Sequence, residues 1–403
     1  MLVVCCATGC VCAGQTGSTS KMHAQQNLPP EVRQALTLEQ QGKIAEATAA
    51  WQRVVQADPK NGQAFAQLGL LEARQEHYRE AIAAYREARR LRPGMPKLEL
   101  NYGLALFKAE EYKEAGAVLA AELGRHPAGP EALRLTTLVG MAHYGAKDYK
   151  AAAPYLKKAA EGDPKNLPLL LALAHCYLWT KQLDAVMEVY RQILEINPDS
   201  AEADMIAGEA LDEKGDNGGA VQQFQAAVKA NPKEPQVHFG LAYLYWTQKR
   251  YDDAVPEFQA ELKNDPENSS AMIYLADTYV RQARYDLARP MLEQALRYKP
   301  EVPLVHLNLG IVLMETNEKE AAARELSKAV QLEPDNVAAH FRLATLYRGM
   351  GKKEEAKVEF AKASALNKKT DEGLFQRIAE AGARGKSSEK SDESKPQTEQ
   401  PNP

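Results

Sequence analysis

The chain has 403 residues, of which 45% are hydrophobic and 26% charged, and its formal net charge at pH 7 is −4. A chain this close to neutral is not expected to have nucleic acid as its main partner. No apolar run reaches the roughly 20 residues of a membrane-spanning helix, so we expect no transmembrane segment.

The N-terminal leader, residues 1–27, begins with an uncharged stretch rich in apolar residues and cysteine and then turns small and polar. This pattern is typical of a secretory signal, here truncated because a positive start is lacking, with cleavage at Val11-Cys12-Ala13. Ala7-Thr8-Gly9-Cys10 also has the form of a degenerate bacterial lipoprotein box. We therefore expect an exported, periplasmic or lipid-anchored protein of a bacterium. The alternative is a disordered leader on a cytoplasmic protein.

The leader has no residue pattern that would form a metal or cofactor site. Its four cysteines lie between residues 5 and 12, too crowded for the usual pairs of zinc ligands, and only His23 is close. A run that mimics a phosphate loop has Gln15 where such a loop requires lysine. The chain is therefore expected to bind no metal and no cofactor.

Prolines recur along the rest of the chain at a nearly constant spacing. Seven of the eight intervals are 34 residues and one is 37. A fixed period of this length predicts an array of structural repeats instead of two or three independent domains. The prolines are Pro59, Pro93, Pro127, Pro164, Pro198, Pro232, Pro266, Pro300 and Pro334.

Residues 62–93 define the repeating unit. From Phe65 to Glu72 the stripe-forming residues recur at i, i+3, i+4 and i+7, which predicts a first helix. From Ala81 to Ala88 the same kind of spacing predicts a second helix. One such pair of helices has too little apolar surface to be stable alone, so consecutive pairs must stack.

Small and polar residues of the unit predict its packing and its ends. Gly69 and Ala81 are small where the two helices should touch, which leaves room for Tyr85. Pro93 cannot donate a backbone hydrogen bond and should end the second helix. After five of these prolines, the residue two positions later is expected to cap the next first helix; these residues are Asn61, Asn166, Ser200, Asn268 and Asn336.

These residues resemble the tetratricopeptide repeat family, whose pattern is an apolar residue, Leu-Gly, Tyr, Ala, an aromatic residue and a closing Pro. The resemblance implies an all-α, right-handed superhelical solenoid of about ten stacked antiparallel helix pairs. The match is looser in the first repeat and in the fifth, where Val186 replaces alanine, and Ala128-Gly129-Pro130 absorbs the three extra residues. The repeats are expected near 28–59, 62–93, 96–127, 133–164, 167–198, 201–232, 235–266, 269–300, 303–334 and 337–368.

An array of this length leaves no room for a separate catalytic domain, and we expect the protein not to be an enzyme. His238, His306 and His340 share the repeat position of Phe65, so their recurrence indicates packing. The chain has no Ser/His/Asp, Cys/His or H-E-x-x-H arrangement. Cys176 lies in the apolar pattern of a first helix and is expected to be a packed thiol.

In the tetratricopeptide repeat family, positions 2, 5, 9 and 12 or 13 of the unit face the concave groove. Transferred position by position, the resemblance therefore nominates partner-binding residues along the first helices. They are Arg134, Tyr144, His175, Trp179, Glu209, Asp212, Glu213, Phe239, Tyr243, Trp246, Asp277, Arg281, Phe341 and Arg348, with apolar positions such as Met141, Leu307, Ile311 and Met314.

Two groups among these residues have a structural and a functional interpretation. Phe239, Tyr243 and Trp246 form a second apolar stripe on their helix, which neighbouring first helices could cover or a bound segment could use as an anchor. The acidic residues from Glu202 to Asp216 are opposed only by Lys214. Such a run is usually a solvated face, but within a groove it favours a basic ligand.

Some members of the family hold a partner's C-terminal carboxylate in a clamp of Lys, Asn and Arg. Asn101 and Arg134 fit two of its positions, but Ala66, Leu70 and Leu138 occupy the others. The clamp is broken, so we do not expect this binding mode.

After the array, residues 371–383 are expected to form a solvating end helix that covers the last repeat. Residues 384–403 are polar and charged with too little apolar content to fold, and they should form a disordered tail.

The sequence therefore predicts a non-catalytic scaffold that binds other proteins, through a peptide segment with basic and apolar residues held in the groove. One alternative is a structural spacer or self-associating rod without a peptide ligand. Another is a regulatory subunit of an enzyme complex. The identity of the partner and the oligomeric state do not follow from the sequence.

Overall fold

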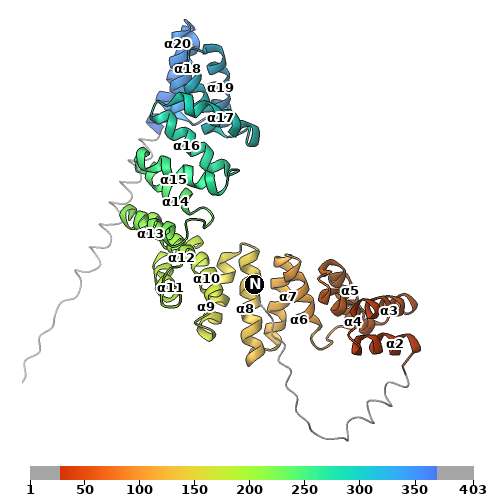
Figure 1. Ribbon diagram of the computed structural model, residues 1–403. Coiled ribbons are helices and arrows are strands. Elements are labelled where there is room, and N and C mark those ends of the chain that lie inside the picture. The colour runs from red at the N-terminus through yellow and green to blue at the C-terminus, as the bar shows by residue number, and fades with distance from the viewer. Residues whose placement is uncertain (1–27, 370–403) are drawn as a thin grey trace, which may run out of the picture. The chain divides into compact units, whose positions relative to one another are not determined.

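The computed structural model describes residues 28–369, which contain helices and no strand (Figure 1). The chain divides into two compact units, unit 1 ending at Lys214 and unit 2 beginning at Gly215. In the described part of unit 1 the helices are α2 (Pro30–Gln40), α3 (Ile44–Ala57), α4 (Gly62–Arg74), α5 (Tyr78–Leu91), α6 (Leu98–Lys108), α7 (Tyr112–Arg125), α8 (Pro130–Gly145), α9 (Tyr149–Gly162), α10 (Leu167–Trp179), α11 (Leu183–Ile196) and α12 (Ala201–Glu213).

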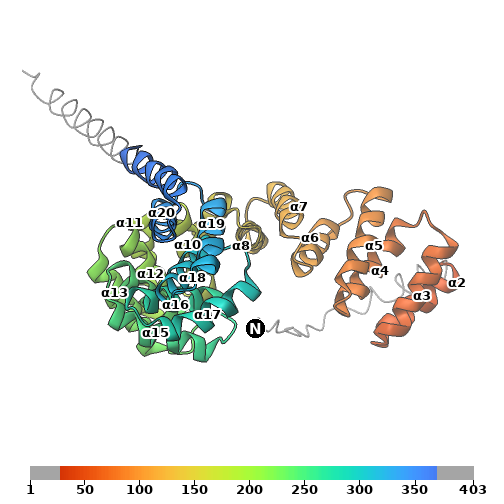
Figure 2. The same cartoon turned by 90° about the horizontal axis from the view of Figure 1, so that it is seen from above.

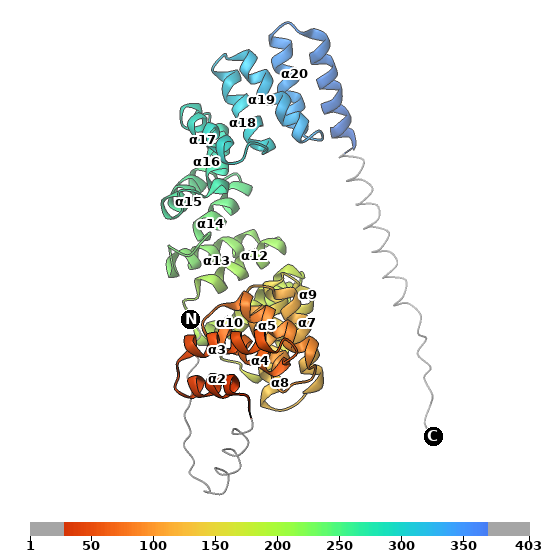
Figure 3. The same cartoon turned by 90° about the vertical axis from the view of Figure 1, so that its right-hand side faces the viewer.

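Unit 2 continues the same alternation of first and second helices. Its described helices are α13 (Asn217–Ala230), α14 (Val237–Thr247), α15 (Tyr251–Asn264), α16 (Ser269–Arg281), α17 (Tyr285–Tyr298), α18 (Pro303–Glu315), α19 (Lys319–Leu332) and α20 (Val337–Gly349), followed by helical residues 353–369. Even-numbered helices are the first helices of the repeats, and odd-numbered helices are the second. Figure 3 shows unit 2 as a succession of such pairs up to α20.

The predicted helix starts are confirmed. In all five positions the side-chain oxygen of the capping residue accepts a hydrogen bond from the backbone N–H three residues later, which satisfies a donor that the first turn leaves unpaired. The caps are Asn61, Asn166, Ser200, Asn268 and Asn336.

The predicted helix ends are confirmed as well. Every second helix from α3 to α19 stops two residues before one of the recurring prolines, as α5 does at Leu91 before Pro93. The position of the three extra residues in the fourth repeat differs from the prediction. Pro130 is already the first residue of α8, which has 16 residues where α4 and α10 have 13, so the insertion lengthens a helix at its start.

Close packing within each pair depends on a glycine of the first helix. A Cβ atom at Gly69 would lie 2.8 Å from the Tyr85 ring, and one at Gly103 would lie 2.6 Å from the Leu119 side chain. Both large residues are fully buried. The glycine therefore lets the second helix approach, which confirms the packing predicted from Gly69 and Tyr85.

The first helices form the inner side of each unit. Consecutive first helices pack against each other, as α8 with α10 and α10 with α12 in unit 1, and α14 with α16 and α16 with α18 in unit 2. Consecutive second helices of the described residues are not in comparable contact. Because the closer set of helices lies inside a curved stack, the first helices line the concave side of their unit. The pairs α4–α5 and α6–α7 are seen side by side in Figure 2.

Three histidines at one repeat position have the structural role that their recurrence predicted. His306 places Nδ1 2.7 Å from the Glu325 carboxylate and Nε2 2.9 Å from the carbonyl oxygen of Pro300. His340 makes the same two kinds of contact one repeat later, and His238 makes the carboxylate contact. Each histidine therefore ties a first helix to the second helix of its own repeat.

Glu359, the carboxylate partner of His340, makes the last described helix pair sensitive to acid. Burial raises the pKa of its carboxyl group, but hydrogen bonds from Lys362 and His340 outweigh burial and lower the pKa below the ordinary 4.5. A carboxylate with a lowered folded-state pKa stabilises the fold above the unfolded-state pKa, and this contribution is lost as the pH falls through the folded-state pKa. At pH 7 we expect Glu359→Gln to lower the free energy of unfolding by about 1 kcal/mol.

Thermal unfolding followed by circular dichroism at pH 7 and below pH 4.5 measures this effect. The difference in unfolding temperature between the wild-type chain and the Glu359→Gln variant should be smaller below pH 4.5 than at pH 7. Glu355→Gln, a change of an exposed acid on the same helix, is the control and should have little effect at either pH. A Glu359 effect of equal size at both pH values would contradict the assignment.

Tyr85 carries a hydroxyl group that has no hydrogen-bond partner among the described residues, although the side chain is 1% exposed. Burial raises the pKa of this hydroxyl. A buried polar group without a partner costs about 1–3 kcal/mol. We therefore expect Tyr85→Phe to leave the free energy of unfolding unchanged or to raise it by about 1 kcal/mol, as measured by urea denaturation.

Tyr102 provides the matched control. Its buried hydroxyl accepts a hydrogen bond from Arg86 Nε at 3.0 Å and donates one to Glu114. Tyr102→Phe removes both bonds and should lower the free energy of unfolding by about 1–2 kcal/mol. Equal losses in the two variants would show that the Tyr85 hydroxyl has a stabilising partner.

The expectations for the two ends of the chain lie outside the described residues. They are the leader (1–27) with its signal or lipoprotein-like segment, the end helix at 371–383 and the tail at 384–403. Within residues 28–369, no helix combines the length and the apolar character needed to cross a membrane.

Candidate functional site

Unit 1 brings aromatic residues of three helices together on its first-helix side. The Tyr144 hydroxyl on α8 lies 3.0 Å from His175 Nδ1 on α10. Tyr149, the first residue of α9, packs edge-on against Tyr144, with ring centroids 5.9 Å apart. It also stacks on Trp179, the last residue of α10, at 5.5 Å. Trp179 is nevertheless 65% exposed, so Tyr149 covers one face of the indole and the other is open.

The two hydrogen-bonded groups of this cluster, on Tyr144 and His175, are neutral at pH 7. Burial lowers the pKa of His175 from the ordinary 6.5. Burial first, and nearby Glu202 second, raise the pKa of Tyr144. The Tyr144–His175 hydrogen bond therefore joins two uncharged groups and fixes α8 against α10, while Trp179 remains available for contact.

Acidic side chains of α12 lie beside this cluster, since α12 packs against α10. Glu213 accepts a hydrogen bond at 2.5 Å from Lys181, two residues after Trp179. Glu209 is exposed to solvent, yet surrounding protein atoms are the largest cause that raises its pKa, followed by repulsion from Glu213 and Asp212. Burial and Glu213 also raise the pKa of Asp212. A cation bound among these carboxylates would relieve their mutual repulsion.

Some acidic residues of the predicted run make structural hydrogen bonds, and others remain accessible. Asp204 is buried and accepts a hydrogen bond at 2.7 Å from the Tyr190 hydroxyl. Asp216 caps α13 by accepting a hydrogen bond at 2.9 Å from the backbone of Gly219. Glu209, Asp212 and Glu213 remain on the first-helix side of α12.

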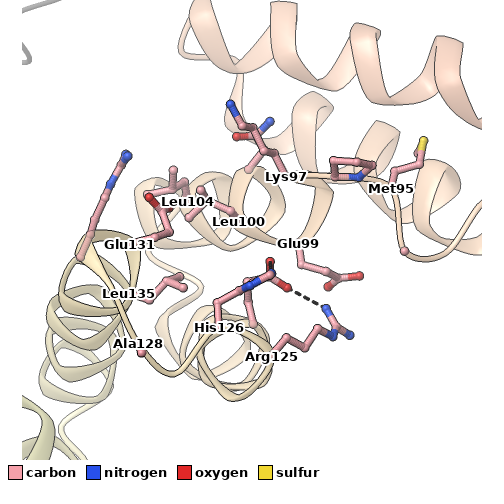
Figure 4. A pocket seen from close by; sticks show the side chains of 15 residues that line it. Met95, Lys97, Glu99, Leu100, Leu104, Arg125, His126, Ala128, Glu131 and Leu135 are labelled. Carbon is pink, nitrogen blue, oxygen red and sulfur yellow. Dashed lines mark hydrogen bonds and ion pairs between the residues drawn. The ribbon is translucent and has the colours of Figure 1, made fainter.

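Arg134, also nominated from the sequence, lines a separate pocket of unit 1. This pocket, of about 690 Å³, lies between α6 and α8, and Lys97 and Glu131 are seen at its margin in Figure 4. Its acids Glu99 and Glu122 are already paired, with Arg89 at 2.9 Å and Arg125 at 2.7 Å respectively. The structure therefore does not place Arg134 with Tyr144 and Trp179.

In unit 2, Phe239, Tyr243 and Trp246 form the stripe that the sequence predicted along α14. Tyr274 on α16 packs edge-on against all three, with ring centroids 6.0, 5.3 and 4.9 Å apart. Phe258 on α15 packs behind Phe239 at 6.0 Å. The three rings are half-buried, so a neighbouring first helix covers the stripe in part, as the structural interpretation required.

Asp277 is placed differently from the other nominated residues because it is buried, with 2% of its surface exposed. It accepts hydrogen bonds from Trp246 Nε1 at 2.7 Å, from Arg281 Nε at 2.6 Å and from Asn308 Nδ2 at 3.0 Å. These donors lie on α14, α16 and α18. Asp277 therefore links three consecutive first helices, and Arg281 is the most exposed member of this network.

Phe341 and Arg348 lie on α20 at the end of the described part of unit 2. Phe341 is 53% exposed and packs edge-on against Phe360 at 5.6 Å. Arg348 is exposed and lies over the same Phe360 ring at 5.3 Å. Both side chains are available for contact on the first-helix side.

Sequence reasoning missed two aromatic residues of these clusters, Tyr149 and Tyr274. Tyr149 had a detectable signal, because tyrosine is the first residue of several second helices: α5, α7, α9, α15 and α17. Tyr274 had no such signal, since its role depends on which rings the preceding first helix carries.

Two observations on the described part of the chain concern metal binding and thiol chemistry. No group of three or more His, Cys, Asp and Glu side chains could hold a metal ion between residues 28 and 369. Cys176 is fully buried, and burial raises the pKa of its thiol to about 12. The thiol is therefore protonated at pH 7, as expected for a packed cysteine.

Family models match most of the chain. The model of the cilia and flagella-associated protein 70 C-terminal domain, which is a tetratricopeptide repeat domain, matches residues 119–336. Models described as tetratricopeptide repeats match residues 32–96 and 66–130, and another matches residues 320–374.

Individual proteins are similar over shorter stretches. A peroxisome biogenesis protein 5 of Arabidopsis thaliana is 27% identical over 155 residues, which are 38% of this chain and 20% of that protein. The chain thus spans about a fifth of the length of this curated relative.

Solved structures of tetratricopeptide repeat proteins are among those similar to parts of this chain. A tetratricopeptide repeat protein of Parabacteroides merdae has a TM-score of 0.46 and 20% identity, covering 62% of this chain and 97% of its own. YrrB, described as a tetratricopeptide repeat protein with an unusual peptide-binding site, has a TM-score of 0.39 and 17% identity, covering 47% of this chain and 97% of its own.

Proposed function

Because the chain belongs to the tetratricopeptide repeat family, we propose that it is a non-catalytic scaffold that binds a segment of a partner protein. The binding site in this proposal is the first-helix side of unit 1. The partner segment carries basic and apolar residues.

The open indole of Trp179 beside the acids of α12 is the observation that carries this proposal. Exposed tryptophan is uncommon on a protein surface unless it serves contact, and tryptophan is enriched among the residues that dominate binding energy. Here Tyr149 stacks behind Trp179 and holds the indole in place. A lysine or arginine side chain of a ligand can lie over the open face of such a ring.

The acids of α12 account for the basic character of the partner segment. Repulsion among Glu209, Asp212 and Glu213 contributes to the raised pKa values of Glu209 and Asp212, and a ligand cation would offset it. The apolar part of the segment would contact Trp179 and the half-buried Met141 and Tyr144.

Binding of a fluorescein-labelled dodecapeptide of alternating Leu and Lys to the full chain tests the proposal by fluorescence anisotropy. The double variant Glu209→Gln, Asp212→Asn should weaken binding at least tenfold at low salt, because it removes two carboxylates from the site. Glu195→Gln removes an exposed acid of α11 and should leave binding unchanged. If the wild-type chain and the double variant bind the peptide with equal affinity, the first-helix side of unit 1 is excluded as the binding site.

A structural spacer or self-associating rod is the second candidate, favoured by one observation. Tyr274 covers part of the aromatic stripe of unit 2, which leaves less of that stripe for a ligand. In a rod, Trp179 would instead contact another copy of the chain, and Trp179→Ala would reduce the mass measured by light scattering. A monomer of unchanged mass in both proteins would exclude self-association through this residue.

A further inference from the structure

Arg281 differs from the other first-helix residues of unit 2 because a buried carboxylate and two rings fix its guanidinium group. Its Nε donates a hydrogen bond to Asp277 at 2.6 Å. Its guanidinium carbon lies 5.3 Å from the ring centre of Trp246 and 5.8 Å from that of Tyr251. We propose that the first-helix side of unit 2 binds an acidic and apolar protein segment, one of whose carboxylates pairs with Arg281.

The fixed guanidinium group retains hydrogen-bond donors for this carboxylate. Of its five N–H groups, Asp277 takes the one on Nε. The Tyr251 hydroxyl is a further neighbour, but the Arg281 side chain is still 43% exposed. A guanidinium can bind a carboxylate through two parallel hydrogen bonds. Because Asp277 and the rings already orient Arg281, binding costs less side-chain freedom than at a mobile arginine.

Other first-helix residues of unit 2 also suit an apolar segment with acidic residues. Met314 on α18 is half-buried and Phe341 on α20 is 53% exposed. Arg348 adds a second exposed guanidinium to the same side. Glu315, the acid of α18, forms no ion pair with Arg281 within the described residues. This side of unit 2 therefore has the opposite charge preference to the acids of unit 1.

The preference of unit 1 for a basic segment and the preference of unit 2 for an acidic segment can be tested separately, because they concern different units. The inference extends the proposed protein-binding function, but it does not require the site around Trp179. Each site can be tested with its own probe.

Fluorescence anisotropy with two labelled dodecapeptides tests the inference on the full chain. One peptide alternates Leu and Glu, and the other alternates Leu and Gln. We expect the Glu peptide to bind at least tenfold more tightly, the difference typical of a charge-assisted bidentate pair. Arg281→Gln should abolish that preference, while Arg281→Lys should keep part of it, since lysine retains the charge and loses the planar fork.

The matched control is Arg284→Gln. Arg284 is exposed, precedes α17 and lies at 4.7 Å over the ring of Tyr279, whose hydroxyl accepts a hydrogen bond from Gln259 on the second helix α15. Its loss should leave the preference for the Glu peptide intact. Circular dichroism confirms that each variant is folded. If Arg281→Gln does not fold, the reduced preference for the Glu peptide expected of Arg281→Lys tests the inference instead.

The outcomes distinguish the two proposals. Equal affinity of the wild-type chain for the Glu and Gln peptides, or an unchanged preference in Arg281→Gln, overturns the inference. Loss of Leu–Lys binding in the Glu209 and Asp212 variant with retained Leu–Glu binding supports both proposals. Failure of the Leu–Lys peptide to bind at all overturns the site on unit 1 and leaves the result at Arg281 standing.

Discussion

Asp277→Ala is expected to lower the free energy of unfolding of unit 2 by about 3 kcal/mol. The substitution removes the acceptor shared by Trp246, Arg281 and Asn308. Asn308 is only 2% exposed, so its amide would lose a partner without gaining water. Arg281 can be rehydrated because it is partly exposed, which keeps the loss below that of a fully buried ion pair.

Hydrogen exchange is the appropriate measurement, because repeat arrays need not unfold in one step. Protection factors of amides in α14, α16 and α18 should fall together in Asp277→Ala, while those in unit 1 stay the same. Asp253→Ala is the control, since Asp253 forms an exposed ion pair with Arg250 that should contribute less than about 1 kcal/mol. Similar effects of the two substitutions would show that the buried network does not stabilise unit 2.

Trp179→Ala is expected to weaken binding of the Leu–Lys peptide at least tenfold while changing stability little. Removing a tryptophan at the centre of a binding site typically costs 2 kcal/mol or more of binding free energy. Because Trp179 is 65% exposed, its removal leaves only a small cavity beside Tyr149. Anisotropy titration gives the affinity, and thermal unfolding gives the stability.

Tyr298→Ala is the control for Trp179→Ala. Tyr298 is a 56% exposed aromatic residue at the end of α17, a second helix, and should not contribute to binding. If Trp179→Ala binds the peptide as tightly as the wild-type chain, Trp179 is not part of the site. If it mainly lowers the unfolding temperature, Trp179 is a packing residue.

The parts of the fold that the sequence predicted depend on residues close together in the chain. The Asn61 cap acts on a backbone group three residues away, and Pro93 ends the helix that stops at Leu91. Gly69 and Tyr85 are separated by one turn between helices, so their contact follows from the pairing of the two helices. These features need only local geometry, and the 34-residue period repeats them.

The parts of the candidate site that the sequence did not predict depend on side chains of neighbouring repeats. Trp246 and Asp277 are 31 residues apart, as are Tyr144 and His175, and in both pairs position 12 of one repeat meets position 9 of the next. Each of these two positions was assigned to the groove without considering that their side chains could contact each other. Whether they face a ligand or bond to each other depends on the chemistry of the pair, so Asp277 was nominated for binding although it is buried.

Within each unit, helices pack against the next helix or the next but one. Contacts therefore join residues that are close in sequence, and the entropy lost in closing loops is small. Such a chain can begin to fold before synthesis is complete, each new hairpin adding to those already formed behind it. Rapid, stepwise folding of this kind leaves little apolar surface exposed for long and so limits aggregation.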